Sequence, residues 1–398
     1  MRVLVAPDKF KGSLTASEAA SAVAEGVRRV YPESTIIELP IADGGEGTLE
    51  AAYRAGFEKR LTTVVGPIGE PINAEWALRK DASGAISALI ETARASGLEH
   101  MPRSSRNALR AHSYGCGQLI TAALDAGAAE VIVCLGGSAM TDGGMGAIRA
   151  LGLSVLDSKG RDVPLGGDGL SEVAAVEASG LDSRLAGISL RLAVDVRNPL
   201  HGPNGAAHVF APQKGATPGD VSLLDSGLRN WAAVLGMADH RETDIPGAGA
   251  AGGFPAPFLT FANASMESGF ALVAELTGLA RELMDADLVI TGEGSLDVQS
   301  LEGKAPIALA HTARVHGVPV LVLAGRILVS DEELALHGVT AAAQLLDCAR
   351  WESGAPDEED AVNNAALYLR GAAARLLTES RAKILRRSPR PERAQELA

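Results

Sequence analysis

The sequence of 398 residues is long enough for two domains, because one hydrophobic core seldom serves more than ~250–300 residues. Hydrophobic residues make up 46% of the chain and charged residues 21%, which is typical of a globular protein. The formal net charge of −13 argues against general nucleic-acid binding, and no apolar run approaches the ~18 residues that span a bilayer. We therefore expect a cytoplasmic monomer or homodimer that binds a small molecule and neither a nucleic acid nor a membrane.

The first sixty residues alternate strand and helix patterns. Residues 1–6 and 35–39 are short apolar runs that predict strands. Between them, Thr15 and Glu18 have the spacing of a capping box at the start of a helix, which ends before Pro32. In an open parallel sheet, ligands bind in loops at the carboxyl ends of strands. The two loops in those places contain Asp8, Lys9, Lys11 and Ser13, and Asp43, Gly44, Gly45 and Glu46.

From about Arg60 the pattern changes, which indicates a second domain. Short strand-like runs at 61–65, 72–79 and 85–91 are separated by Gly/Pro turns without a helix between them. Strands are also expected at 131–135 and 190–194, followed by the glycine-rich loop 136–144 and by Asp195. The glycine-rich loop contains the further candidate site residues Gly137, Ser138 and Asp142, and a Pro/Gly loop at 209–215 contains Lys214.

The segment Gly247–Gly253 has the spacing G-x-G-x-x-G, but it follows Pro246 instead of a strand. Two prolines, Pro255 and Pro257, interrupt any helix after it. A dinucleotide site needs a strand, a turn and a helix in that order, so we predict a hinge between domains here instead.

Near the C-terminal end the chain returns to the pattern of its first sixty residues. A strand at 287–291 precedes Glu293 and Asp297, and a helix at 304–315, which begins with Lys304, leads to another strand at 318–324. We therefore predict an α/β fold with a Rossmann- or flavodoxin-like parallel-sheet domain, formed by residues 1–60 and 280–378. An inserted mixed α/β domain of residues 61–279 interrupts it, and residues 379–398 form a charged, frayed tail.

Five loops combine glycine or proline with an acid, and some add a lysine. Acids for a divalent cation, lysines for phosphate oxygens and glycines for close approach are what phosphoryl transfer needs. The Walker A pattern is missing, because the Gly303-Lys304 pair is followed by Ala305, and the protein-kinase signatures are missing too. A sensor that binds a hydroxy acid or nucleotide without catalysis is the alternative, although it would not need clustered carboxylates.

Six motifs in order resemble the bacterial class I glycerate kinases, the glycerate 2-kinase family. They cover roughly Arg2 to Gly325 and read A-P-D-K-F-K-G-S-L from Ala6, P-I-A-D-G-G-E-G-T from Pro40, D-V-R-N-P-L-H-G-P-N-G-A from Asp195, P-Q-K-G-A from Pro212, P-G-A-G-A-A-G-G from Pro246 and A-D-L-V-I-T-G-E-G-S-L-D-V-Q-S from Ala286.

The resemblance implies ATP- and Mg²⁺-dependent phosphorylation of D-glycerate to 2-phospho-D-glycerate. It also implies two α/β domains, one inserted in the other, with the active site in the cleft between them. The chain departs from the family pattern at Met140 and Thr141, where the family has Thr and Asn, and at His112 and Ser113, where it has two threonines. These departures leave open another small hydroxy acid as acceptor, or 3-phosphoglycerate as product.

We assign roles to the loop residues on this basis. Asp43 and Asp195 are the candidates for orienting or deprotonating the acceptor hydroxyl, and Lys9 and Lys11 are expected to hold phosphate or the glycerate carboxylate. The predicted metal ligands are Glu46, Asp142 and Asp297. The predicted substrate- or phosphate-binding residues are Asp8, Ser13, Gly44, Gly45, Gly137, Ser138, Lys214, Glu293 and Lys304.

Overall fold

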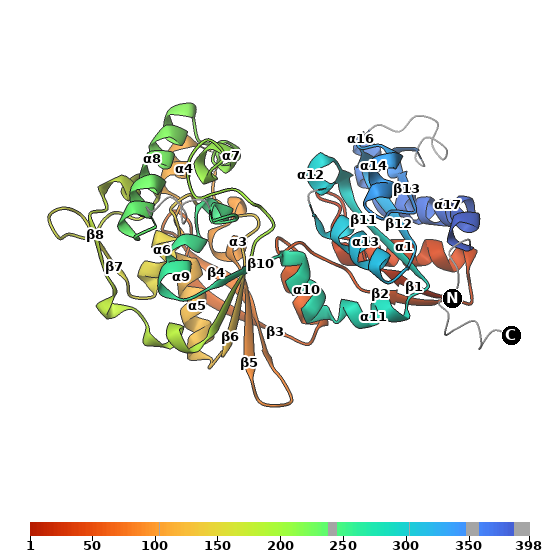
Figure 1. The fold of residues 1–398 in the computed structure, drawn as a ribbon, viewed down its shortest axis with the longest axis horizontal. Helices are drawn as coiled ribbons and strands as arrows, with labels where there is room; N and C mark the ends of the chain where they lie inside the picture. Colours follow the sequence, from red (N-terminus) through yellow and green to blue (C-terminus); the bar gives the residue numbers. More distant parts are fainter. Residues whose placement is uncertain (103, 238–244, 302, 348–357, 386–398) are drawn as a thin grey trace. The chain divides into compact units, whose positions relative to one another are not determined.

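The computed structural model describes residues 1–102, 104–237, 245–301, 303–347 and 358–385. The chain forms two compact units, one of Met1–Asp43 with Val273–Ala398 and the other of Gly44–Leu272 (Figure 1). Each unit combines a β-sheet with α-helices, so the predicted α/β class is confirmed. No helix among the described residues is long and apolar enough to cross a membrane.

The first unit is built on a five-stranded sheet in which all neighbours are parallel. The strand order is β13-β12-β11-β1-β2, and Val3 of β1 pairs with Leu288 of β11 on one side and Ile36 of β2 on the other. The strands are β1 (Arg2–Val5), β2 (Thr35–Glu38), β11 (Leu288–Leu296), β12 (Val320–Ile327) and β13 (Ala341–Gln344).

Helices cover both faces of this sheet. On one face, α1 and α17 pack together over residues such as Val3, Ile290 and Leu323. Alternate residues of the strands point to the other face, where α13 contacts β11 and β12. The helices of this unit are α1 (Ala16–Val30), α11 (Leu279–Asp285), α12 (Val298–Leu301), α13 (Ala305–Val315), α14 (Asp331–Leu336), α16 (Glu358–Asn363) and α17 (Ala365–Leu385).

Helix α1 begins where its sequence predicts. The Thr15 hydroxyl accepts a hydrogen bond from the backbone N–H of Glu18, and the Glu18 carboxylate accepts one from the N–H of Thr15. This capping box satisfies two amide groups that the first turn would leave unpaired. The helix therefore starts directly after the Asp8–Ser13 loop and fixes that loop at the carboxyl end of β1.

The second unit contains a six-stranded mixed sheet in the order β10-β9-β6-β5-β4-β3. The pairs from β10 to β5 are parallel, whereas β5-β4 and β4-β3 are antiparallel hairpin pairs, as the Gly/Pro turns predict. The strands are β3 (Glu58–Val65), β4 (Pro71–Lys80), β5 (Ile86–Glu91), β6 (Glu130–Cys134), β9 (Ser189–Ala193) and β10 (Ser265–Glu267).

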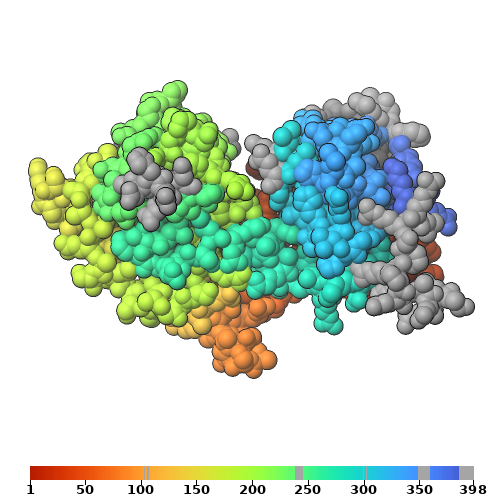
Figure 2. All heavy atoms as spheres, in the orientation of Figure 1, coloured from red at the N-terminus to blue at the C-terminus, as the bar shows by residue number. Residues whose placement is uncertain are grey.

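A separate antiparallel ribbon belongs to the second unit. It consists of β7 (Ser154–Leu156) and β8 (Ala175–Glu177), and it protrudes at the left edge of the molecule in Figure 2. The helices that accompany the six-stranded sheet are α2 (Thr48–Arg54), α3 (Thr92–Ser96), α4 (Ser105–Arg110), α5 (Tyr114–Asp125), α6 (Met145–Ala150), α7 (Ala206–Phe210), α8 (Pro218–Val234), α9 (Pro255–Phe261) and α10 (Gly269–Thr277).

The predicted domain boundaries at 60/61 and 279/280 differ from the division of the structure, at 43/44 and 272/273. The first shift arises because α2 contacts β4 and β5 of the second unit. The buried Glu91 carboxylate at the end of β5 also accepts a hydrogen bond of 2.8 Å from the N–H of Leu49 in α2. The second boundary of the structure, at 272/273, lies within α10, which begins two residues after β10 ends.

Three further expectations need correction. Gly247–Gly253 is not a hinge, because it lies inside the second unit, where the N–H of Gly143 donates to the carbonyl of Gly252 at 3.0 Å. Glu293 is not in a loop, because β11 continues to Leu296. The predicted tail is helical up to Leu385 as the end of α17, and residues 386–398 lie outside the described residues.

Candidate active site

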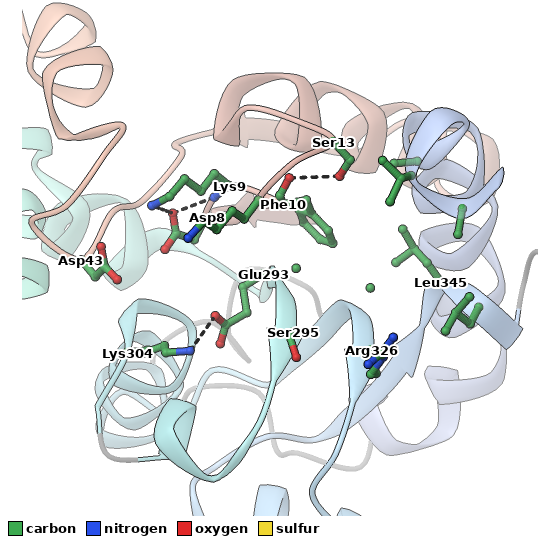
Figure 3. Close-up of a pocket in the computed structure, with 17 residues that line it drawn as sticks. Asp8, Lys9, Phe10, Ser13, Asp43, Glu293, Ser295, Lys304, Arg326 and Leu345 are labelled. Atoms are coloured by element: carbon green, nitrogen blue, oxygen red, sulfur yellow. Dashed lines mark hydrogen bonds and ion pairs between the residues drawn. The ribbon is translucent and has the colours of Figure 1, made fainter. Parts of the chain in front are cut away.

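A cavity of about 530 Å³ lies in the first unit, at the carboxyl ends of β1, β11 and β12 (Figure 3). This is the edge of a parallel sheet at which ligands are expected. Its polar lining contains seven of the sixteen predicted site residues together with Arg326 and Ser295. The seven are Asp8, Lys9, Lys11, Ser13, Asp43, Glu293 and Lys304.

Asp8 directly follows β1 and is held in place by two backbone contacts. Its N–H donates to the carbonyl of Gly292 at 2.8 Å, and its own carboxylate accepts a hydrogen bond of 2.6 Å from the N–H of Lys9. Burial raises the pKa of Asp8 to about 7; the Lys9 ammonium opposes this shift, and the Asp43 and Glu293 carboxylates add to it. Asp8 therefore titrates near neutrality.

Glu293 belongs to β11, and its side chain points toward Lys304 in Figure 3. Burial raises the pKa of Glu293, Lys304 opposes the shift, and Asp43 and Asp297 add to it. One carboxylate oxygen, Oε1, is buried without a hydrogen-bond partner among the described residues. A buried acceptor without a partner is costly, so this oxygen is suited to a ligand.

Lys304 stands at the N-terminus of α13 and connects the acids of this cavity. Its Nζ lies 3.6 Å from Oε2 of Glu293 and 3.8 Å from Oδ1 of Asp297, and it donates to Oγ of Ser300 at 3.2 Å. Oδ1 of Asp297 also accepts a hydrogen bond of 3.0 Å from the N–H of Ser300. Asp297 therefore adjoins the cavity through Lys304.

The other eight predicted residues belong to the second unit, where three loops meet. The loop of Gly44 and Gly45 approaches Gly269 and Asp195: a Cβ added at Gly44 would lie 2.9 Å from Cα of Gly269 and 3.6 Å from Oδ2 of Asp195. The same loop approaches the glycine-rich loop, since a Cβ added at Gly136 would lie 2.5 Å from Cα of Gly45. Only glycine allows such approaches. Oδ1 of Asp195 accepts hydrogen bonds from the N–H of Gly269 and the hydroxyl of Ser268 at the start of α10.

The remaining residues of these loops have local roles in the second unit. The carbonyl of Gly137 accepts a hydrogen bond of 3.2 Å from the N–H of Leu98, and Ser138 pairs with Gly97 in an isolated β-bridge. Glu46 is exposed and adds to the raised pKa of Glu91, whose main cause is burial.

Asp142 is fully buried beneath the glycine-rich loop, and both its oxygens are already engaged. Oδ2 accepts hydrogen bonds from the N–H and the hydroxyl of Ser113 and from the N–H of Gly146, while Oδ1 accepts one from the N–H of Gly144. A metal ion would have to displace these donors. We therefore interpret Asp142 as a structural brace.

The chain also matches a known protein family. The model of the Glycerate kinase family matches residues 3–380. The chain belongs to this family. The family resemblance and the prediction of a phosphotransferase are thereby confirmed.

Relatives and a solved structure extend over most of the chain. The chain is 42% identical to the glycerate 2-kinase of Escherichia coli over 87% of its own length and 91% of the relative's. It is 43% identical to the glycerate kinase of Bacillus subtilis, over 93% and 95% of the two lengths. A crystal structure of a candidate glycerate kinase 2 from Salmonella typhimurium LT2 superposes with a TM-score of 0.80 at 39% identity, covering 96% of this chain and 98% of that chain.

Several lining residues of the cavity in this glycerate kinase family member were missed from the sequence, among them Arg326 and Phe10. Arg326 follows Gly325 near the end of β12, so the rule that placed the other loops at strand ends could have identified it. Phe10 lies between charged residues, and no pattern distinguishes a cavity-lining ring from a core ring.

Lys214 is also buried, with only 2% of its surface exposed. Its Nζ donates to the carbonyl of Met140 at 2.5 Å and lies 3.5 Å from the Thr141 hydroxyl. Burial lowers the pKa of Lys214 to about 8, and Asp142 opposes the shift. The ammonium therefore binds the inner side of the glycine-rich loop, and this position does not favour the predicted phosphate contact.

Lys214→Met tests this interpretation through stability. Because the folded pKa of about 8 lies below the ordinary value of 10.5, the unfolded chain binds more protons between these values. The stability of the wild type should thus rise relative to that of the variant as the pH increases through this window. Urea midpoints of both proteins at about pH 7 and about pH 9.5 measure the difference. A constant difference would show that Lys214 is not buried as described.

Proposed function

We propose that the chain phosphorylates D-glycerate to 2-phospho-D-glycerate with ATP as the phosphoryl donor and Mg²⁺ as the metal. The observation that carries this proposal is the single cavity that combines Asp8, Asp43 and Glu293 with Lys9 and Lys304. Phosphoryl transfer depends mainly on positioning and charge stabilisation, and this mixture of charges supplies both. The relatives named glycerate kinase and glycerate 2-kinase support the choice of acceptor.

In the proposed reaction, the acceptor hydroxyl attacks the terminal phosphorus of ATP, and its proton passes to the Asp43 carboxylate. The bond from that phosphorus to the bridging oxygen breaks, and ADP leaves with the electron pair. Lys9, Lys11 and Lys304 are placed to offset the negative charge on the phosphoryl oxygens.

The acids of the cavity fit a divalent cation that shares its coordination with phosphate. No group of three or more His, Cys, Asp or Glu side chains within the described ranges can hold a metal ion by itself. Mg²⁺ needs fewer protein ligands, because it is commonly bound by one or two carboxylates together with substrate phosphates and water. The unpartnered Oε1 of Glu293 and the buried Asp8 carboxylate, which the Asp43 and Glu293 carboxylates repel, are the groups that would hold it. Bound Mg²⁺ would neutralise charge on the phosphates.

The four departures from the family pattern support glycerate over a different acceptor. Met140, Thr141, His112 and Ser113 are all buried within the second unit, with at most 5% exposed. The Ser113 hydroxyl holds Asp142, and the Thr141 hydroxyl lies beside Lys214. Changes at such positions alter packing beneath the loop and leave the groups on its surface in place.

The decisive experiment measures ADP release with ATP, Mg²⁺ and D-glycerate, next to a panel of other small hydroxy acids. Phosphorus NMR of the product identifies the oxygen that carries the phosphate. We expect release with D-glycerate and phosphate on the 2-hydroxyl. Phosphate on the 3-hydroxyl would contradict the assigned product, and preference for another acid would contradict the assigned acceptor. Binding without release would indicate a sensor.

The raised pKa of Asp8 predicts a stability gain in the Asp8→Asn variant. The folded pKa of about 7 exceeds the ordinary value of 3.8, so ionisation of Asp8 costs the native state stability as the pH rises through this range. The variant lacks this cost. Its melting temperature should therefore exceed that of the wild type at about pH 8 and approach it at about pH 4, while its activity is lower. A variant less stable at both pH values would contradict the prediction.

A further inference from the structure

The cavity of the first unit has two chemically different ends. Figure 3 shows the charged side chains of Asp8, Lys9, Asp43, Glu293 and Lys304 gathered at one end, with Leu345 at the other and Phe10 between them. The rest of the apolar lining comes from the segment after β13 and from α16 and α17; α17 contacts β13, which directly precedes Leu345, and α16 contacts α17. These lining residues are Leu346, Ala361, Val362 and Ala365, none of which carries a polar side-chain group.

Glycerate does not account for the apolar end. It is a small, highly polar anion, and burial of its hydroxyls and carboxylate against leucine and alanine would leave them without partners. A volume of about 530 Å³ is also far larger than glycerate requires and lies within the ~300–1,000 Å³ range of pockets that enclose drug-sized ligands. A nucleoside triphosphate has both parts, since its phosphates are anionic and the faces of its planar aromatic base pack against apolar side chains.

The charges fix the direction of such a ligand. Lys9 and Lys304 stand at the same end as Asp43, the proposed proton acceptor, so the terminal phosphate belongs there. The reverse orientation would place the phosphates near Leu345, with Arg326 in place of Lys9 and Lys304. Arg326 also lines the cavity near Leu345 in Figure 3, and a guanidinium can stack on a base.

We propose that this cavity is the nucleotide site, with the base between Phe10 and Leu345 at the apolar end and the terminal phosphate next to Asp43. This inference rests on the proposed function, since it places the co-substrate of that reaction. It assigns the nucleotide to the unit formed by Met1–Asp43 and Val273–Ala398 and gives its orientation.

Val362→Trp tests the proposal on the full-length protein. The Val362 side chain lines the apolar end but is 47% exposed, so a larger ring should fill the cavity without disturbing the core. Leu367→Trp is the matched control, because Leu367 is 43% exposed in α17 and does not line the cavity. ADP binding is measured by calorimetry without glycerate, and the KM values for ATP and D-glycerate are measured in steady state.

We expect the wild type and Leu367→Trp to bind ADP equally, and Val362→Trp to bind it about tenfold more weakly with a similar rise in the KM for ATP. The KM for D-glycerate should remain within about twofold. A Val362→Trp variant that changes only the KM for D-glycerate, or a wild type that does not bind ADP, would overturn the proposal. ADP binding that is weakened as expected, in a protein that transfers no phosphate to glycerate, would uphold the nucleotide site and refute the proposed function.

Discussion

The Asp43→Asn variant is expected to turn over about 10²–10⁴ times more slowly than the wild type, the range that a general base contributes. Asparagine has the shape of aspartate but cannot accept the proton of the acceptor hydroxyl. Because Asp43 lines the cavity and is only partly buried, the melting temperature of the variant should differ from that of the wild type by no more than a few degrees. Coupled ADP release gives kcat, and thermal denaturation gives the melting temperature.

Asp162→Asn provides the control for this substitution. The Asp162 side chain is 71% exposed and follows the turn after β7, in the protruding ribbon of the second unit, so its loss should leave kcat unchanged. Asp195→Asn separates the two predicted general bases. If that variant lost activity at an unchanged melting temperature while Asp43→Asn kept normal turnover, the assignment to Asp43 would be wrong.

Loss of the Lys304 ammonium is expected to lower kcat/KM by about 10²–10³, the effect of removing one preorganised donor from a transition state. It should also lower stability, because the nearest cation to the buried Glu293 disappears. Glu293 would then have an even higher pKa, so the stability loss in Lys304→Met should be larger at about pH 8 than at about pH 5.

The double variant Lys304→Met/Glu293→Gln separates these two effects. Glutamine carries no charge, so the double variant should recover most of the lost stability. Activity should stay low, because the cation that faces the phosphate is still absent. The four proteins to compare are the wild type, Lys304→Met, Glu293→Gln and the double variant. Urea unfolding gives the stability of each, and steady-state kinetics gives its activity. Recovery of activity together with stability would mean that Lys304 acts only by neutralising Glu293.

Most of the fold follows from local patterns in the sequence. Thr15 and Glu18 predict the start of α1, and alternating Gly/Pro turns predict the antiparallel pairs β5-β4 and β4-β3. The place of α2 does not follow, because its seven residues obtain their stability from β4 and β5, which come later in the chain. The end of β11 was missed because Gly292 and Gly294 are typical of loops, although here they lie within a strand.

The candidate site, like the fold, follows only in part from the sequence. Asp8 and Asp43 come together because both follow parallel strands of one sheet, which periodicity can predict, and Glu293 lies in the second half of the neighbouring strand β11. Asp142 and Lys214 lie in segments of similar composition, but their side chains bond to the backbone of the loops around them. Whether a polar residue near glycines faces a ligand or braces a loop depends on packing between distant segments, such as Lys214 against Met140. Sequence patterns do not carry that information.

The pairing of β1 with β11 in the first sheet joins segments that are far apart in the sequence. Val3 of β1 lies opposite Leu288 of β11, and the whole of Gly44–Leu272 is synthesised between them. At ~5–20 residues per second, a ribosome takes roughly 11–46 s to make that intervening stretch. Throughout this interval, β1 exposes a valine-rich edge whose neighbour does not yet exist. β1 can therefore pair with β11 only after the whole contiguous second unit has been made.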